Sequence, residues 1–196
     1  MSRTAETDSP ILPVIADRWS PRAFDPDREM REGELACLFE AARWAASSSN
    51  LQPWHFVHAF RGDRAFATIR DCLNPTNAAW AGRASVLAIA IARTIREDGR
   101  PNRHATHDLG QALASLALQA TSMSAAVHQM AGFDPERARR DLGVPEGYEP
   151  FTAVAIGWPA DPATLPEPLR ERELASRRRR PVAEFAFRGG WPGAER

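Results

Sequence analysis

The sequence contains no lysine, and all 25 of its basic residues are arginine. This absence excludes a lysine Schiff base, and with it pyridoxal phosphate chemistry. It also excludes the Walker-A phosphate loop, which requires a lysine. A phosphate site in this chain must therefore be built from guanidinium groups, which bind phosphate oxygens in pairs and stay charged.

The sequence also has few cysteines, no long apolar run and no net charge. Two cysteines, Cys37 and Cys72, are too few for a disulfide framework or a cysteine metal cluster. The most apolar run, residues 85–92, is far shorter than the roughly 20 residues that cross a bilayer. The first ten residues lack the apolar core of a secretion signal. We therefore expect a cytoplasmic protein that has no membrane partner.

The 25 basic and 25 acidic side chains cancel, so the chain has no overall field that attracts nucleic acid. At 196 residues and 43% hydrophobic composition it can form one domain with a sizeable core. Neither a repeat nor a linker is visible. We expect a single domain over residues 12–196, preceded by a flexible segment, residues 1–11.

The hydrophobic periodicity predicts helices and strands in mixed order. The expected helices are 33–46, 63–73, 106–130 and 134–143, and the expected strands are 54–60, 85–92, 151–158 and a short edge strand or arm over 182–187. The helix over 106–130 is apolar nearly all round, which indicates burial or a subunit interface. The pattern predicts an α+β fold with a small sheet, and an extended C-terminal arm that would wrap a second subunit.

Three segments carry candidate chemistry. Residues 18–22 (Arg-Trp-Ser-Pro-Arg) place two guanidinium groups and a hydroxyl on one side of a turn, which suits a phosphate, although a solvated basic turn is the commoner reading of such a segment. Residues 47–54 (Ser-Ser-Ser-Asn-Leu-Gln-Pro-Trp) offer hydroxyls and amides for a polyol or a ring edge, or form an ordinary helix-stop loop. Residues 177–180 are four arginines, and without interleaved aromatic residues they do not favour nucleic acid.

His104, His107 and Asp108 stand together where the helix over 106–130 begins. Their spacing suggests a metal, but no third histidine, cysteine or carboxylate follows at metal-site spacing. Helix capping and surface roles are therefore expected, and no metal.

Taken together and in this order, these segments resemble the nitroreductase family. The resemblance rests on Arg18-x-Ser20-x-Arg22, on residues 47–54, on residues 128–134 (His-Gln-Met-Ala-Gly-Phe-Asp), on residues 156–159 (Ile-Gly-Trp-Pro) and on the Arg-x-Arg-x-Pro motif that ends at Pro181. The subgroup that it resembles is that of flavin reductases and broad-range nitroreductases. It implies a small mixed sheet flanked by helices, a long central helix at a dimer interface, and a homodimer with FMN at the subunit interface. It also implies an enzyme that passes a hydride from NADH or NADPH through flavin N5 to nitroaromatic, quinone or similar small acceptors by a ping-pong mechanism.

The resemblance also implies roles for individual residues. Those expected to contact the FMN phosphate and ribityl chain in the same subunit are Arg18, Trp19, Ser20, Arg22, Arg177 and Arg179, and those expected from the facing subunit are Ser47, Ser48, Asn50 and Gln52. The backbone of Met130, Ala131 and Gly132 is expected near N5, with Asn77 at the pyrimidine edge. Trp80 and His128 are expected to line the substrate side, with a packing role as the alternative for His128. The flavin carries the chemistry, so no protein residue is expected to be catalytic.

Two departures from the family pattern bear on the substrate. Ala46 precedes Ser47 where many members have proline, and only a brief loop, residues 93–103, stands where longer members carry a helical insertion. A short loop indicates an open site. Two alternatives therefore stay open: a flavin reductase that supplies reduced FMN to a partner monooxygenase, and a flavin-binding protein of the same fold without turnover.

Overall fold

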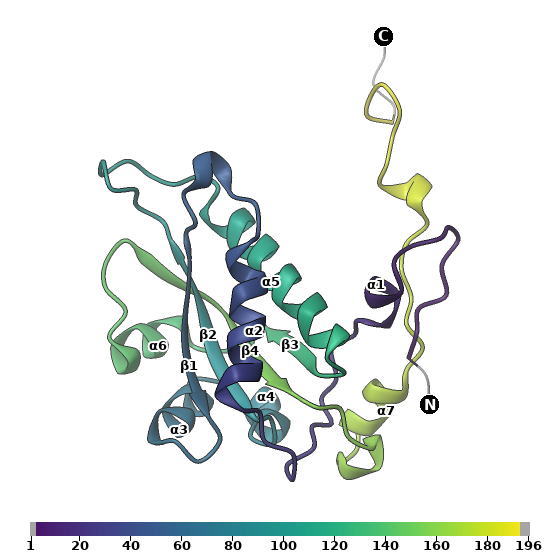
Figure 1. The fold of residues 1–196 in the computed structure, drawn as a ribbon. Coiled ribbons are helices and arrows are strands. Elements are labelled where there is room, and N and C mark those ends of the chain that lie inside the picture. The colour runs from purple at the N-terminus through teal and green to yellow at the C-terminus, as the bar shows by residue number, and fades with distance from the viewer. Residues whose placement is uncertain (1–2, 193–196) are drawn as a thin grey trace.

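The computed structural model describes residues 3–192. Its centre is a sheet of four strands in the order β1-β2-β4-β3 (Figure 1). The strands are β1 (Trp54–Phe60), β2 (Val86–Arg93), β3 (Ala126–Met130) and β4 (Tyr148–Gly157). All three pairings are antiparallel, so the expectation of a mixed sheet was wrong. The strands predicted over 54–60, 85–92 and 151–158 are confirmed as β1, β2 and β4.

Helices cover both faces of the sheet. On one face lie α2 (Glu32–Arg43) and α5 (Ala105–Ser122), which pack against each other. The other face carries α3 (Arg64–Asp71), α4 (Pro75–Ala81) and α6 (Pro135–Leu142). Strand β2 is almost wholly buried because it is covered from both sides. A continuous apolar run therefore reports two covered faces, and it does not require a parallel sheet.

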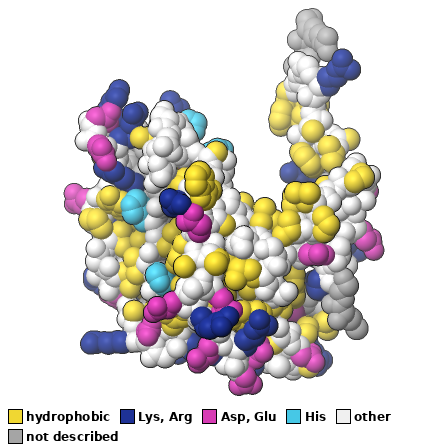
Figure 2. Space-filling view, viewed as in Figure 1, with side chains coloured by type: hydrophobic (Ala, Val, Ile, Leu, Met, Phe, Trp, Pro, Cys, Tyr) yellow, Lys and Arg dark blue, Asp and Glu magenta, His cyan; other side chains and the backbone are white. Residues whose placement is uncertain are grey.

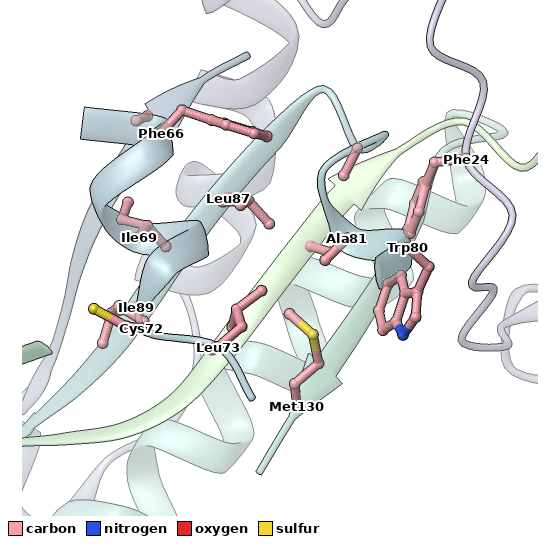
Figure 3. Packing of buried hydrophobic residues seen from close by; sticks show 14 of the residues in the cluster. Phe24, Phe66, Ile69, Cys72, Leu73, Trp80, Ala81, Leu87, Ile89 and Met130 are labelled. Carbon is pink, nitrogen blue, oxygen red and sulfur yellow. The ribbon is translucent and has the colours of Figure 1, made fainter. Parts of the chain in front are cut away.

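Alternate residues of β2 divide the core into two clusters, as the two-residue period of a strand requires. Leu87 and Ile89 pack with Ile69 of α3, as Figure 3 shows, while Val86 and Ala88 pack against the α2 and α5 side. The sheet thus has an apolar cluster on each face, between it and the helices that cover that face.

The helix predicted over 106–130 was too long. Helix α5 ends at Ser122, Ser124 has a φ of +60°, and β3 then pairs with β4. The sequence Ala-Val-His-Gln-Met fits a helix as well as a strand, and only the pairing with β4 decides between them.

The C-terminal part is an extended arm, as predicted. It includes the short helix α7 (Leu169–Leu174) and then leaves the body of the molecule (Figure 1). Of the two alternatives predicted for 182–187, an edge strand or an arm, the structure shows the arm, in which Val182–Glu184 make one 3-10 turn. Hydrophobic side chains gather along the arm (Figure 2), and the large exposed ones are Leu174, Val182, Phe185, Phe187 and Trp191. No helix within residues 3–192 is both long and apolar enough to span a membrane.

Candidate functional site

The segment 18–22 follows the short helix α1 (Pro13–Asp17) and is held by two distant parts of the chain. The carbonyl of Pro21 accepts a hydrogen bond from Nδ1 of His128 in β3, at 2.8 Å. The carboxylate of Glu173 in α7 accepts the backbone N–H of Arg22 at 2.9 and 3.0 Å, and that of Ala23 at 3.2 Å. The Arg22 guanidinium lies 3.7 Å from the same carboxylate. Contacts from both β3 and the arm thus fix this segment.

Arg177 approaches the same region from the arm. Its guanidinium donates to the carbonyls of Ala16 at 2.7 Å and of Arg18 at 2.8 Å, and it also contacts the carbonyl of Arg3. Arg179 is exposed and donates to its neighbour's carbonyl at 2.8 Å. Of the two arm arginines expected to meet a phosphate, the structure ties Arg177 to the backbone and leaves the Arg179 side chain at the surface.

The arginines form a cluster of like charge. The pKa of Arg18 is lowered, first by partial burial and then by repulsion from Arg179. The pKa of Arg177 is lowered for the same reasons, with repulsion from Arg18, Arg179 and Arg3. Arg18 also donates to the Ser20 hydroxyl at 3.3 Å. Mutual repulsion of this kind is relieved when an anion binds, so this donor set fits a phosphate group.

Trp19 lies beside this cluster. The Arg3 guanidinium stands over its ring, 4.9 Å from the centroid. Trp19 also lines a hollow of about 930 Å³ together with Asp17 and residues 159–163. The residue is therefore part of the packing between the N-terminal segment and the arm.

Gly132 and Asn77, expected near the flavin ring, do come together. The Gly132 carbonyl accepts hydrogen bonds from the Asn77 side chain and from the Asn74 N–H, each at 3.0 Å. A Cβ on Gly132 would lie 2.2 Å from the Asn74 amide nitrogen and 2.7 Å from that of Asn77. Only glycine permits this approach. Asn74 was not predicted, although an Asn-Pro pair is a common helix start, and its side chain indeed caps α4.

The neighbouring residues Met130 and Trp80 point into the core. Met130 is 3% exposed and Trp80 1% exposed. Trp80 packs against Phe24 (Figure 3), and its ring centroid is 4.5 Å from that of His128. Met130 can contribute only its backbone here, as expected. The Trp80 side chain is buried within the single chain, and its expected place on the substrate side stays a prediction.

His128 is neutral. Burial lowers its pKa from 6.5 to about 4, against the opposing effect of the hydrogen bond to Pro21. It therefore acts as a packing and hydrogen-bonding group that holds the segment 18–22 against β3.

The loop 47–52 lies elsewhere, at the N-terminal end of α5. The Ser48 N–H donates to the buried carboxylate of Asp108, at 3.0 Å, and His107 contacts the other oxygen of that carboxylate, also at 3.0 Å. The Gln52 N–H donates to the Ser47 hydroxyl at 3.1 Å. Three residues of this loop, Ser49, Asn50 and Gln52, have φ values of +52°, +54° and +45°. Such strained backbone is retained where surroundings or function require it.

The two groups of site residues are separated by the length of a helix. The loop 47–52 is bonded to the first turn of α5, whereas α1 packs near the other end of α5 (Figure 1). Helix α5 has 18 residues, which gives about 27 Å. One chain therefore presents two half-sites that face different regions of space.

The chain thus combines an α+β fold with a cluster of arginines whose donors fit an anion. The chain belongs to the nitroreductase family, because the model of that family matches residues 15–72 and 63–158.

Individual relatives agree with this assignment. A solved structure described as an oxidoreductase containing FMN is 37% identical, with a TM-score of 0.92 over 99% of both chains. An uncharacterized 15.4 kDa protein of Mycolicibacterium smegmatis is 40% identical over 129 residues, which is 66% of this chain and 86% of the relative. The major NAD(P)H-flavin oxidoreductase of Aliivibrio fischeri is 40% identical over 48 residues, 24% of this chain and 22% of that protein. A nitroreductase family protein of Clostridium difficile shares the fold at 19% identity, with a TM-score of 0.69 over 91% of this chain and 97% of that one.

Proposed function

We propose that this protein is an FMN-dependent NAD(P)H oxidoreductase that works as a homodimer. The observation that carries the proposal is the pair of half-sites at opposite ends of α5. In a symmetric dimer the same two surfaces meet twice, so the segment 18–22 of one subunit can face the loop 47–52 of the other. The exposed apolar side chains of the arm would be covered by the same assembly.

In this arrangement Arg18, Ser20 and Arg179 would hold the FMN phosphate, with Arg22 beside them. The backbone at Ala131 and Gly132, together with Asn77, would face the flavin ring. From the partner subunit, Ser47, Ser48, Asn50 and Gln52 would contact the ribityl chain and ring. Bound FMN would supply the redox chemistry, taking a hydride from NADH or NADPH and passing it to an acceptor. The protein's own contribution is binding, orientation and a positive neighbourhood.

The colour of the purified protein tests the proposal most simply. We expect a yellow dimer that releases FMN, and not FAD, on denaturation. A colourless preparation that does not take up added FMN would contradict the proposal. Bleaching of the flavin by NADH or NADPH without oxygen would distinguish an enzyme from a flavin-binding protein without turnover.

A second candidate function is flavin reduction for a partner enzyme. It is favoured by the local similarity to the flavin oxidoreductase of Aliivibrio fischeri. It is also favoured by the short connection between β2, which ends at Arg93, and α5, which begins at Ala105. Reoxidation of the reduced protein by nitrofurazone or menadione supports the first function, whereas preferential transfer to excess free FMN supports the second.

A further inference from the structure

Two side chains of the C-terminal arm, Glu173 and Arg177, form hydrogen bonds with the backbone in and around the segment 18–22. Glu173 accepts backbone N–H groups at Arg22 and Ala23, 151 and 150 positions away in sequence. Arg177 donates to backbone carbonyls at Ala16 and Arg18. One side chain uses the backbone donors and the other uses the backbone acceptors.

The burial of Glu173 makes its hydrogen bonds to this backbone strong. Its side chain is 0% exposed, and its carboxylate accepts three hydrogen bonds from the backbone besides pairing with the Arg22 guanidinium. A buried carboxylate requires such compensation, and hydrogen bonds to an ionised acceptor are stronger than neutral ones. A carboxylate repels a phosphate, so Glu173 cannot itself be a phosphate ligand. Its effect on a bound anion must pass through the residues that it holds.

Arg177 has little capacity left for a ligand. Its guanidinium is directed at three carbonyl oxygens, those of Arg3, Ala16 and Arg18. By contrast, Arg18 bonds only the Ser20 hydroxyl and Arg179 only its neighbour's carbonyl among the described residues. Arg177 and Arg179 belong to the same sequence motif, but their side chains therefore have different roles.

We propose that Glu173 and Arg177 are positioning residues for the FMN phosphate. They fasten the arm to the segment 18–22 and fix its backbone, which sets the directions of Arg18, Ser20 and Arg22 before the cofactor binds. The phosphate itself is left to Arg18, Ser20 and Arg179. This inference rests on the proposed function, since it assumes that the bound anion is the FMN phosphate.

Comparison of FMN with riboflavin, which lacks the phosphate, tests the proposal. The variant is Glu173→Gln, which keeps the size of the side chain but turns a donor toward the backbone N–H groups. Its matched control is Glu171→Gln, an exposed residue of the same helix. Dissociation constants are measured on apoprotein by quenching of flavin fluorescence, after gel filtration and thermal melting have shown that each variant is folded.

We expect Glu173→Gln to weaken FMN binding about tenfold or more, while riboflavin binding changes less than about twofold. Glu171→Gln should behave as the wild type. An unchanged preference for FMN over riboflavin in Glu173→Gln would overturn the inference, and so would an equal loss for both flavins. If Glu173→Gln does not fold, Glu173→Asp keeps the charge but withdraws the carboxylate by one methylene, and an unchanged preference in that variant overturns the inference equally.

Hydrogen exchange of the apoprotein separates positioning from direct contact. Glu173→Gln and Arg177→Ala should speed exchange of the Arg22 and Ala23 amides before any FMN is added, whereas Arg18→Ala should not. If the Arg22 and Ala23 amides of Arg177→Ala exchange at the wild-type rate, Arg177 is a ligand of the phosphate and not a positioning residue. A wild-type protein that binds FMN no better than riboflavin would overturn the proposed function and this inference together. If the wild type prefers FMN and Glu173→Gln keeps the same preference, only the inference is overturned.

Discussion

Among the described glycines, Gly132 is the one at which an added Cβ would meet the closest neighbours. The Asn74 and Asn77 amides stand where a Cβ would be. Gly132→Ala should therefore force one or both asparagines away and reduce the free energy of unfolding by about 1–3 kcal/mol. Thermal and urea unfolding check this. The control is Gly33→Ala in the first turn of α2, where an added Cβ meets nothing within 4 Å and no loss of stability is expected. Equal behaviour of the two variants would contradict the close approach.

The lowered pKa of His128 predicts how the free energy of unfolding depends on pH. Its pKa is lowered in the folded chain from 6.5 to about 4, so above pH 6.5 it is neutral whether folded or unfolded. Between pH 6.5 and about 4 the unfolded chain takes up a proton here that the folded chain does not. The free energy of unfolding should therefore fall as the pH falls, by about 2 kcal/mol between pH 7 and pH 5. His128→Gln should lack this part of the pH dependence. Parallel curves for variant and wild type would show that His128 does not cause it.

At the scale of elements, Asp108 connects the first turn of α5 to the loop 47–52. Its buried carboxylate accepts the Ser48 N–H, and the loop holds three residues at positive φ. Asp108→Asn should weaken this hydrogen bond and reduce stability by about 1–3 kcal/mol. Because the loop is proposed to meet the ribityl chain and ring, affinity for FMN and for riboflavin should fall together, unlike in Glu173→Gln. The exposed Glu136→Gln, in the first turn of α6, is the control. Loss of FMN affinity alone would place the loop at the phosphate instead.

Elements with strong local signals could be predicted from sequence. The side chain of Asp134 caps α6, Pro135 begins it and Gly143 ends it in the left-handed conformation, as the sequence indicates. Strand β1 has the predicted bounds. The end of α5 and the whole of β3 could not be predicted, because residues 126–130 fit two periods and only pairing with β4 selects one. Helices α4 and α7 are short, and their stability comes from packing that local pattern does not reveal.

Some residues of the candidate site could likewise be predicted from the sequence, and others could not. The family resemblance implied that the segment 18–22, the loop 47–52, Gly132 and Asn77 belong to one site, and in the structure the Asn77 side chain donates a hydrogen bond to the Gly132 carbonyl. Glu173 was not predicted, since nothing near it in sequence indicates a buried carboxylate; its partners are about 150 residues away. The burial of Trp80 could not be predicted either, because an aromatic residue near a motif can line a site or pack in the core.

At the scale of the whole molecule, the account depends on two subunits. The arm exposes large apolar side chains, and the two half-sites lie at opposite ends of α5 within one chain. In the proposed homodimer each site takes Arg18 from one subunit and Asn50 from the other. A defect in either residue alone should damage both sites of a homodimer.

Complementation between two variants tests this claim most directly. Arg18→Ala and Asn50→Ala are expected to retain little FMN as separate homodimers. Co-expressed with different affinity tags, they form a heterodimer in which one site carries both substitutions and the other carries neither. The account predicts that the doubly purified heterodimer binds about one FMN per dimer with wild-type affinity. A heterodimer that binds no better than either homodimer would contradict it, because that result requires both residues of each site to come from the same chain.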